Sequence, residues 1–457
     1  FDNSLFHTHI VFYSRHFVKV CFLFDLSYSN FMAKSLIQYF DEHVENSDFR
    51  KIKQQGFGKS IESWISNGER HINVNGEILK IPNCKTFHDF LLYFFEYKFD
   101  KNWLRAPENI SHPLSIWYNK TNEIISYQQV SSRGFYKTPC IGAVMALLRL
   151  SYNLYLLAHN VELQSQLINR LKQIDQFQGA YYETYVVSYL IYSGFDVAIE
   201  NEKDGSAKHH DYIATVKETG IKYAVEVKIC SKKNVLGARQ GNKTTKTVGD
   251  HLYKALLKPT DKKRIIFIEM NTDNNNWYNE VSEILNQKEQ SLTIKGKPAP
   301  KAYLFLTNIN YHYHLNDTDY EANNIFTGFK IDDFHKNLQN HKDILDFELK
   351  HIDCLELFSD MQNFEIPSTF NGENPNIEFT SNKVNGVINE FIKHQENIGQ
   401  KTTFEMYNFY YQCYRQSKKE KLLEFIDPKN WHPEINDFSQ ERLAKLYYRL
   451  LSFYGRF

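Results

Sequence analysis

The sequence predicts an α/β fold: a mixed central sheet flanked by helices, between N- and C-terminal regions that are mainly α-helical. From residue 178 to residue 307, hydrophobic patterns typical of helices alternate with patterns typical of strands. Two of the predicted strands are separated only by Glu218-Thr219-Gly220, a short turn suited to an antiparallel hairpin. On both sides of this segment apolar residues recur mainly at helical spacing, which predicts the helical flanking regions.

The N-terminal part consists of a segment at 1–29, which the pattern does not assign, and a mainly helical domain at 30–174. Helices are expected at 31–44, 87–99, 141–159 and 161–174. The third of these helices is apolar over most of its circumference. A helix of that kind is expected to be buried, because it has no polar face to present to water.

The α/β core is expected at 175–310, in the order helix, strand, strand, strand, helix, strand, helix, strand. These elements are predicted at 180–192, 195–200, 211–217, 222–229, 247–258, 264–270, 277–287 and 302–307. The C-terminal region, 311–457, is expected to be mixed at first and helical later. It includes a predicted loop at 360–382, rich in Asn, Pro, Ser and Gly, followed by helices at 384–396, 403–426 and 440–457.

The composition is that of an ordinary globular protein, with 42% hydrophobic and 24% charged residues in a chain of 457. The six cysteines are widely scattered without a CxxC pair, which argues against a disulfide framework and a zinc finger. No continuous apolar span of about 20 residues is present, so no membrane partner is expected. A reduced, cytoplasmic setting is the simplest expectation.

The most informative residues are Asp211, which opens one strand of the predicted hairpin, and Glu226-Val227-Lys228, which ends the next strand. Because the hairpin is antiparallel with a short turn, Asp211 is expected to lie near Glu226. Glu226 and Lys228 are two residues apart and therefore leave the same face of their strand. The opposite face is apolar and would hold the strand against the core; it consists of Tyr223, Val225, Val227 and Ile229.

Two or three carboxylates on such a frame suffice for Mg²⁺ or Mn²⁺, since hard divalent cations prefer oxygen ligands and keep several waters. A divalent metal can activate water and neutralise the charge that develops when a phosphodiester is cleaved. The predicted ligands are Asp211 and Glu226, with Glu183 of the preceding helix as the third. Lys228 would contact the scissile phosphate or polarise the attacking water. Taken one at a time, these residues are also compatible with a solvated Glu/Lys pair, a turn aspartate and an exposed helix glutamate.

Glu183, Asp211 and Glu226-Val227-Lys228, together with the order of the predicted elements, resemble the PD-(D/E)XK, or restriction-endonuclease-like, nuclease superfamily over roughly residues 175–310. One departure is that His210 stands where the family name has Pro. The resemblance implies a restriction-endonuclease-like core and Mg²⁺- or Mn²⁺-dependent cleavage, of DNA in most members and of RNA in some. Some members have lost activity. A prokaryotic restriction or anti-phage defence system is the setting that the analogy suggests.

The charge distribution points to a nucleic acid as the partner. Lys+Arg and Asp+Glu are both 54 over the whole chain, but the segment 228–264 contains eleven basic residues and only two acidic ones, Asp250 and Asp261. The basic residues are Lys228, Lys232, Lys233, Arg239, Lys243, Lys246, Lys254, Lys258, Lys262, Lys263 and Arg264. Such a segment neutralises phosphates, although it is also compatible with a solvated basic face. The predicted nucleic-acid contacts are Lys232, Lys233, Arg239, Lys243, Lys246 and His210.

The sequence therefore favours a metal-dependent endonuclease that acts on DNA. One alternative is an RNA nuclease of the same fold. Another is a nucleic-acid-binding or assembly protein whose core is catalytically inactive. A homodimer or a complex with a partner protein is compatible with all of them, but nothing in the sequence fixes an interface.

Overall fold

The computed structural model describes residues 63–370, apart from 127–137, 201–208, 238–246 and a few single positions or pairs, and in addition Arg442 and Leu446. The helix expected at 31–44 and the helices expected at 384–396, 403–426 and 440–457 lie outside these residues, apart from those two positions. So do most of the loop expected at 360–382 and three predicted nucleic-acid contacts, Arg239, Lys243 and Lys246.

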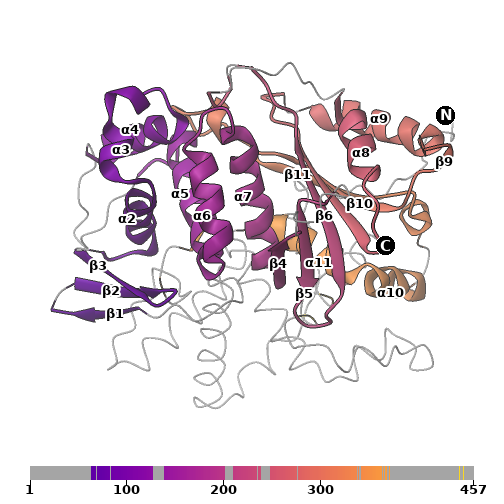
Figure 1. Cartoon of the computed structure of the whole chain (residues 1–457), viewed down its shortest axis with the longest axis horizontal. Helices are drawn as coiled ribbons and strands as arrows, with labels where there is room; N and C mark the ends of the chain where they lie inside the picture. Colours follow the sequence, from indigo (N-terminus) through magenta and orange to yellow (C-terminus); the bar gives the residue numbers. More distant parts are fainter. Residues whose placement is uncertain are drawn as a thin grey trace, which may run out of the picture.

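A six-stranded mixed sheet forms the centre of the described part, with the strand order β11-β10-β7-β6-β5-β4 (Figure 1). The strands are β4 Phe195–Ile199, β5 Tyr212–Val216, β6 Lys222–Ile229, β7 Lys263–Glu269, β10 Ala302–Asn308 and β11 Asn323–Phe329. Neighbours β4, β5 and β6 pair antiparallel, β6, β7 and β10 pair parallel, and β11 pairs antiparallel with β10. The predicted α/β class with a mixed central sheet is confirmed.

Two helices make the parallel half of the sheet possible. Parallel neighbours need a crossover connection, and α8 Val248–Leu256 and α9 Trp277–Ser291 supply it between β6 and β7 and between β7 and β10. β10 is buried at every position and β7 along its last five residues. Continuous apolar runs are typical of strands covered on both faces, which is why the sequence located both strands within one residue of their observed bounds.

Helices cover both faces of the sheet (Figure 1). On one face α7 Phe177–Tyr192 packs against β6, with α5 Gly142–Leu156 and α11 Ile352–Gln362 beside α7. On the other face, α8 and α9 form a second core with Ile266 and Ile268 of β7. Glu226 and Lys228 are in register with Ile266 and Ile268. Side chains alternate along neighbouring strands in register, so Glu226 and Lys228 leave β6 on the face covered by α8 and α9.

The described residues up to 171 contain three of the four helices expected there and one small sheet that was not predicted. α2 Phe87–Phe99 has the predicted bounds and begins with a capping box between Thr86 and Asp89. α5 continues into a 3₁₀ turn, Leu157–His159, and is buried at every position except Met145, as expected. The other elements up to residue 171 are α3 Lys101–Arg105, the 3₁₀ turn Pro107–Asn109, α4 Pro113–Ser126 and α6 Val161–Leu171.

The unpredicted sheet is an antiparallel meander of β1 Ser63–Ser66, β2 Glu69–Val74 and β3 Glu77–Pro82. The turn between β2 and β3 is Asn75-Gly76, and both residues have positive φ, 54° and 86°. Only Gly and Asn adopt this conformation readily, so the Asn-Gly pair was a hairpin signal in a region expected to be mainly helical.

The last described part extends the sheet beyond the predicted core. β11 lies after residue 310, where the sequence predicted the core to end, so the central sheet includes a strand from the C-terminal region. The other elements are the hairpin β8 Thr293–Ile294 and β9 Lys297–Pro298, the 3₁₀ turns Tyr311–Tyr313 and Asp332–His335, and α10 His341–Lys350. Among the helices that the structure describes, none has both the length and the apolar character that crossing a bilayer requires.

Arg442 is bound to the acidic side of α11. Its guanidinium forms an ion pair with Asp353 and lies 3.5 Å from Glu356 Oε1 and 3.6 Å from Glu218 Oε2. Asp353 also accepts a hydrogen bond of 2.7 Å from the Tyr223 hydroxyl of β6. The side chains of Arg442 and Asp353 are only 2% and 5% exposed. Because a buried carboxylate is costly without a partner, this pair couples residue 442 to the stability of the core.

A second buried group is Glu269, the last residue of β7, which is 3% exposed. Its Oε1 accepts hydrogen bonds from the backbone N–H groups of Ile309 at 2.8 Å and Asn271 at 3.2 Å. Its Oε2 lies 2.5 Å from Thr307 Oγ1. Burial raises the pKa of Glu269 to about 7, because the hydrogen bonds only partly offset the loss of solvation.

We expect Arg442→Met to lower the free energy of unfolding by about 3–5 kcal/mol, since it leaves Asp353 buried without its cation. Urea denaturation of the full chain measures this. The matched control is Lys301→Met, which breaks a 3.4 Å pair with Asp332 whose side chains are 64% and 84% exposed and should leave stability unchanged. A variant at Arg442 that is as stable as the control would contradict the assigned role.

Glu269 should make stability depend on pH. Its pKa in the folded protein, about 7, exceeds the ordinary value of 4.5, so the folded state binds the proton more tightly than the unfolded state. Glu269 therefore contributes about 3 kcal/mol to the free energy of unfolding when it is protonated. This contribution is complete below pH 4.5 and is lost as the pH rises through about 7. Urea denaturation at about pH 5 and about pH 8 should show that Glu269→Gln removes this loss. Glu283 is exposed, so the control variant Glu283→Gln should lose as much stability between these two pH values as the wild type does. If Glu269→Gln also loses as much stability as the wild type, the prediction is wrong.

Candidate functional site

The site lies where the β5–β6 ladder ends. The last antiparallel pair is Tyr212 with Val225, and beyond it β6 pairs only with β7 among the described strands. Asp211, just before β5, donates its backbone N–H to Val225 O at 3.1 Å. Its side-chain Oδ2 accepts the N–H of Val227 at 2.7 Å. The Asp211 carboxylate thus satisfies a backbone donor that the ladder leaves open, and this contact fixes the side chain beside β6.

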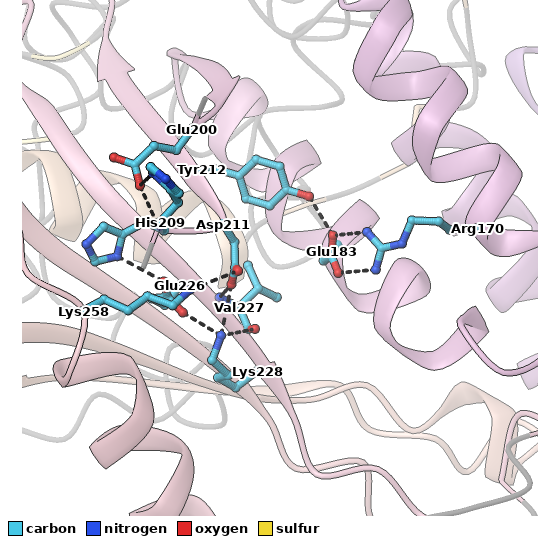
Figure 2. Close-up of polar contacts among 11 residues, drawn as sticks. Arg170, Glu183, Glu200, His209, Asp211, Tyr212, Glu226, Val227, Lys228 and Lys258 are labelled. Carbon is cyan, nitrogen blue, oxygen red and sulfur yellow. Dashed lines mark hydrogen bonds and ion pairs between the residues drawn. The ribbon is translucent and has the colours of Figure 1, made fainter. Parts of the chain in front are cut away.

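Two lysines bridge the carboxylates of Asp211 and Glu226 (Figure 2). Lys228 Nζ lies 3.1 Å from Asp211 Oδ2 and 2.6 Å from Glu226 Oε2. Lys258 Nζ lies 3.5 Å from Asp211 Oδ1 and 2.5 Å from Glu226 Oε1. The structure therefore brings together Asp211, Glu226 and Lys228, as the sequence predicted, and adds a fourth charged group.

The charges of these groups stabilise one another in a mostly buried setting. The Glu226 side chain is 2% exposed, and burial alone would raise its pKa. Hydrogen bonds from His210, Lys228 and Lys258, together with the charge of Lys228, outweigh that effect, so the pKa of Glu226 is below its ordinary value. Burial lowers the pKa of Lys228, but Asp211 and Glu226 raise it to a net value above the ordinary one. Both groups are therefore charged at neutral pH.

Lys258 was not predicted as a site residue, although it belongs to the basic segment. It lies two residues beyond the end of α8 and immediately before Pro259. Because β7 runs parallel to β6, the chain that enters β7 returns to the beginning of β6, where Tyr223 is in register with Lys263. The long side chain of Lys258 then reaches Glu226. Only the crossover topology could have indicated this contact from the sequence.

Glu183 is not part of this group of charges. It belongs to α7, on the opposite face of the sheet from Glu226, and its carboxylate forms a bidentate pair with Arg170 of α6 at 2.6 and 2.7 Å (Figure 2). It also accepts a hydrogen bond of 2.8 Å from the Tyr212 hydroxyl. Within the part of the chain that the structure describes, no set of three or more His, Cys, Asp or Glu residues could hold a metal ion. The structure thus does not bring Glu183 into the predicted ligand set.

His210 supports Glu226 instead of facing the solvent. Its Nδ1 lies 3.0 Å from Glu226 Oε1, and its side chain is 1% exposed. Its backbone N–H is donated to the Glu200 carboxylate, and His209 Nδ1 lies 3.9 Å from the same carboxylate. The predicted contact between His210 and a nucleic acid is incompatible with this burial. Of the other predicted contacts, Lys232 and Lys233 are described and lie three and four residues beyond the end of β6.

The donor set fits a hard divalent cation. Asp211 directly precedes β5 and Glu226 lies in β6, and both present their oxygens to shared cations, here the two ammonium groups. Mg²⁺ and Mn²⁺ prefer oxygen ligands, and two carboxylates suffice when water completes the coordination. No protein-family model, curated protein or solved structure matches this chain. The geometry of the site is therefore the observation that bears on its function.

If the metal ligands are Asp211 and Glu226 alone, substitutions should separate them from Glu183. We expect Asp211→Asn and Glu226→Gln to abolish Mn²⁺ binding measured by isothermal titration calorimetry. Glu183→Gln should change the affinity by less than about three-fold, because the Arg170 pair keeps Glu183 on the other face of the sheet. Loss of Mn²⁺ binding in a folded Glu183→Gln variant would instead show that Glu183 is a ligand.

Proposed function

We propose that this chain is a metal-dependent endonuclease that hydrolyses phosphodiester bonds in DNA. The observation that carries the proposal is the carboxylate pair Asp211 and Glu226, which shares the ammonium group of Lys228 at the end of the β5–β6 ladder. These residues are three of the four on which the resemblance to the PD-(D/E)XK superfamily rests; the fourth, Glu183, is paired with Arg170 on the other face of the sheet. A restriction-endonuclease-like core is part of the same proposal, and the mixed sheet flanked by helices supports it.

Asp211 and Glu226 would hold Mg²⁺ or Mn²⁺ through their side-chain oxygens. The metal would lower the pKa of a bound water and neutralise the charge that develops on the phosphate. The protein orients both carboxylates in advance: Val227 N–H fixes Asp211, and His210 fixes Glu226. Such pre-positioning removes the cost of ordering the ligands when substrate binds.

Lys228 would act beside the carboxylates on the reacting phosphate. Its ammonium is held by Asp211, Glu226 and the carbonyl oxygen of Val227, the last at 3.1 Å. Its raised pKa keeps it protonated, so it can donate to a phosphate oxygen or orient the attacking water. A fixed positive charge in a partly buried site stabilises developing negative charge more than the same charge in water does.

Basic residues on both sides of the site support a polyanionic substrate. Lys232 and Lys233 follow β6, and Lys258 and Lys262 lie between α8 and β7, whereas Lys263 lies over the Tyr223 ring on the other face of the sheet. Contacts of the first four lysines to phosphates would release counterions, so affinity should fall as salt rises. By analogy with the superfamily, we place this activity in a prokaryotic restriction or anti-phage defence system, in which a second copy or a partner protein assists in cutting both strands.

The test is cleavage of supercoiled plasmid, linear duplex, single-stranded DNA and RNA with Mg²⁺ or Mn²⁺ and with a chelator. We expect metal-dependent cutting of DNA, and loss of at least about 100-fold in rate for Lys228→Ala with binding and folding preserved. Lys222→Ala is the matched control, because Lys222 is an exposed residue of the same strand. Near-normal cutting by Lys228→Ala would contradict its role.

The same assay distinguishes the alternatives. If the protein cleaves RNA and none of the DNA substrates, its substrate is RNA and the proposed mechanism still applies. Salt-sensitive binding without cleavage of any substrate would identify a binding protein on an inactive core.

A further inference from the structure

The four carboxylate oxygens of the site form two edges, and each edge has its own lysine. Asp211 Oδ2 and Glu226 Oε2 share Lys228, at 3.1 and 2.6 Å. Asp211 Oδ1 and Glu226 Oε1 share Lys258, at 3.5 and 2.5 Å. Two carboxylates are thus balanced by two ammonium groups. A divalent cation would have to enter a site whose charge is already neutralised.

The first edge is tied to the fold. Asp211 Oδ2 accepts the backbone N–H of Val227 as well as the Lys228 contact, so both of its lone pairs are used. Lys228 itself extends from β6, two residues after Glu226, and also donates to Val227 O. To vacate this edge, Lys228 would have to break its contact with Asp211 and two contacts within its own strand, to Glu226 Oε2 and Val227 O.

The second edge is bridged by a lysine from outside the sheet, and its Glu226 Oε1 also lies 3.0 Å from His210 Nδ1, a contact that remains when Lys258 leaves. Lys258 comes from the segment between α8 and β7, and among the described residues its ammonium contacts only Asp211 Oδ1 and Glu226 Oε1. The contact to Asp211 is the longest of the four, 3.5 Å. The long, flexible side chain of a lysine can turn away from this edge without changing the backbone. Lys258 belongs to the basic segment 228–264, to which the proposed function assigns phosphate contacts.

We propose that Lys258 is an internal counter-cation: its ammonium occupies the edge where the divalent metal binds, and it must leave that edge when the metal enters. This inference rests on the proposed function. Lys258 stabilises the carboxylate pair in the absence of metal, competes with the metal for Asp211 Oδ1 and Glu226 Oε1, and is released toward the phosphates of the substrate. Because the metal must displace Lys258, the metal site assembles only above a certain metal concentration.

The test is Mn²⁺ binding to the full chain without nucleic acid, measured by isothermal titration calorimetry. Lys258→Met removes the competing charge and keeps most of the aliphatic side chain, so it should bind Mn²⁺ about ten-fold more tightly or better, or about 1.4 kcal/mol. The matched control is Lys254→Met, which removes the same charge from an exposed position of α8 and should bind like the wild type. Lys258→Arg keeps the charge and should not show the gain.

Thermal unfolding gives a second readout. Without metal, Lys258→Met should melt at a lower temperature than the wild type, because the carboxylate pair has lost one cation. With saturating Mn²⁺ its melting temperature should rise by more than that of the wild type, since ligand binding stabilises according to affinity. A residue with a merely structural role would show only the first effect. If Lys258→Met does not fold, Lys258→Gln tests the same exchange with a polar side chain.

The outcomes separate this inference from the proposed function. Tighter Mn²⁺ binding that disappears in the double variant Glu226→Gln/Lys258→Met supports the counter-cation. Equal or weaker binding by a folded Lys258 variant, with the wild type binding normally, overturns the counter-cation and leaves the metal site intact. Absence of Mn²⁺ binding in both the wild type and the variant overturns both.

Discussion

The carboxylate of Glu226 is buried in the central sheet, and the rest of the site depends on the charges that compensate it. An isolated buried carboxylate costs several kcal/mol or takes up a proton. Here Lys228, Lys258 and His210 lie within 3.0 Å of its oxygens and keep it ionised. These partners come from β6, from the segment after α8 and from the residue before Asp211. Burial of one group therefore fixes the relative positions of three parts of the chain.

The topology of the sheet creates the position that these groups occupy. β6 is the strand at which the sheet changes from antiparallel to parallel pairing, because β5 lies on one side and β7 on the other. β5 begins opposite Val225, so the last part of β6 has a neighbour on one side only among the described strands. The Asp211 carboxylate occupies this opening by accepting the N–H of Val227. The same contact that ends the ladder also places the Asp211 carboxylate beside Glu226.

Local sequence patterns predicted those strands whose conformation depends mainly on their own residues. Alternation of side chains gave β6 with its observed bounds, and apolar runs gave β7 and β10 to within one residue. The hairpin predicted that Asp211 meets Glu226 and Lys228, and it does. Lys258 and the Arg170–Glu183 pair could not be predicted, because both depend on how helices return to the sheet. β11 was not predicted either: its Asn and Gly residues are weak strand formers, and pairing with β10 decides its conformation.

We infer that Asp211 and Glu226 form a site for a divalent cation that shares its place with Lys258. Crystals of the full chain grown with Mn²⁺ would test it through anomalous scattering. We expect a peak about 2–2.5 Å from Asp211 Oδ1 and Glu226 Oε1, with the Lys258 ammonium displaced and Lys228 still in place. If no peak lies at this edge and both lysines still bridge the carboxylates under saturating Mn²⁺, the pair is a structural ion cluster and the proposed catalytic site is wrong.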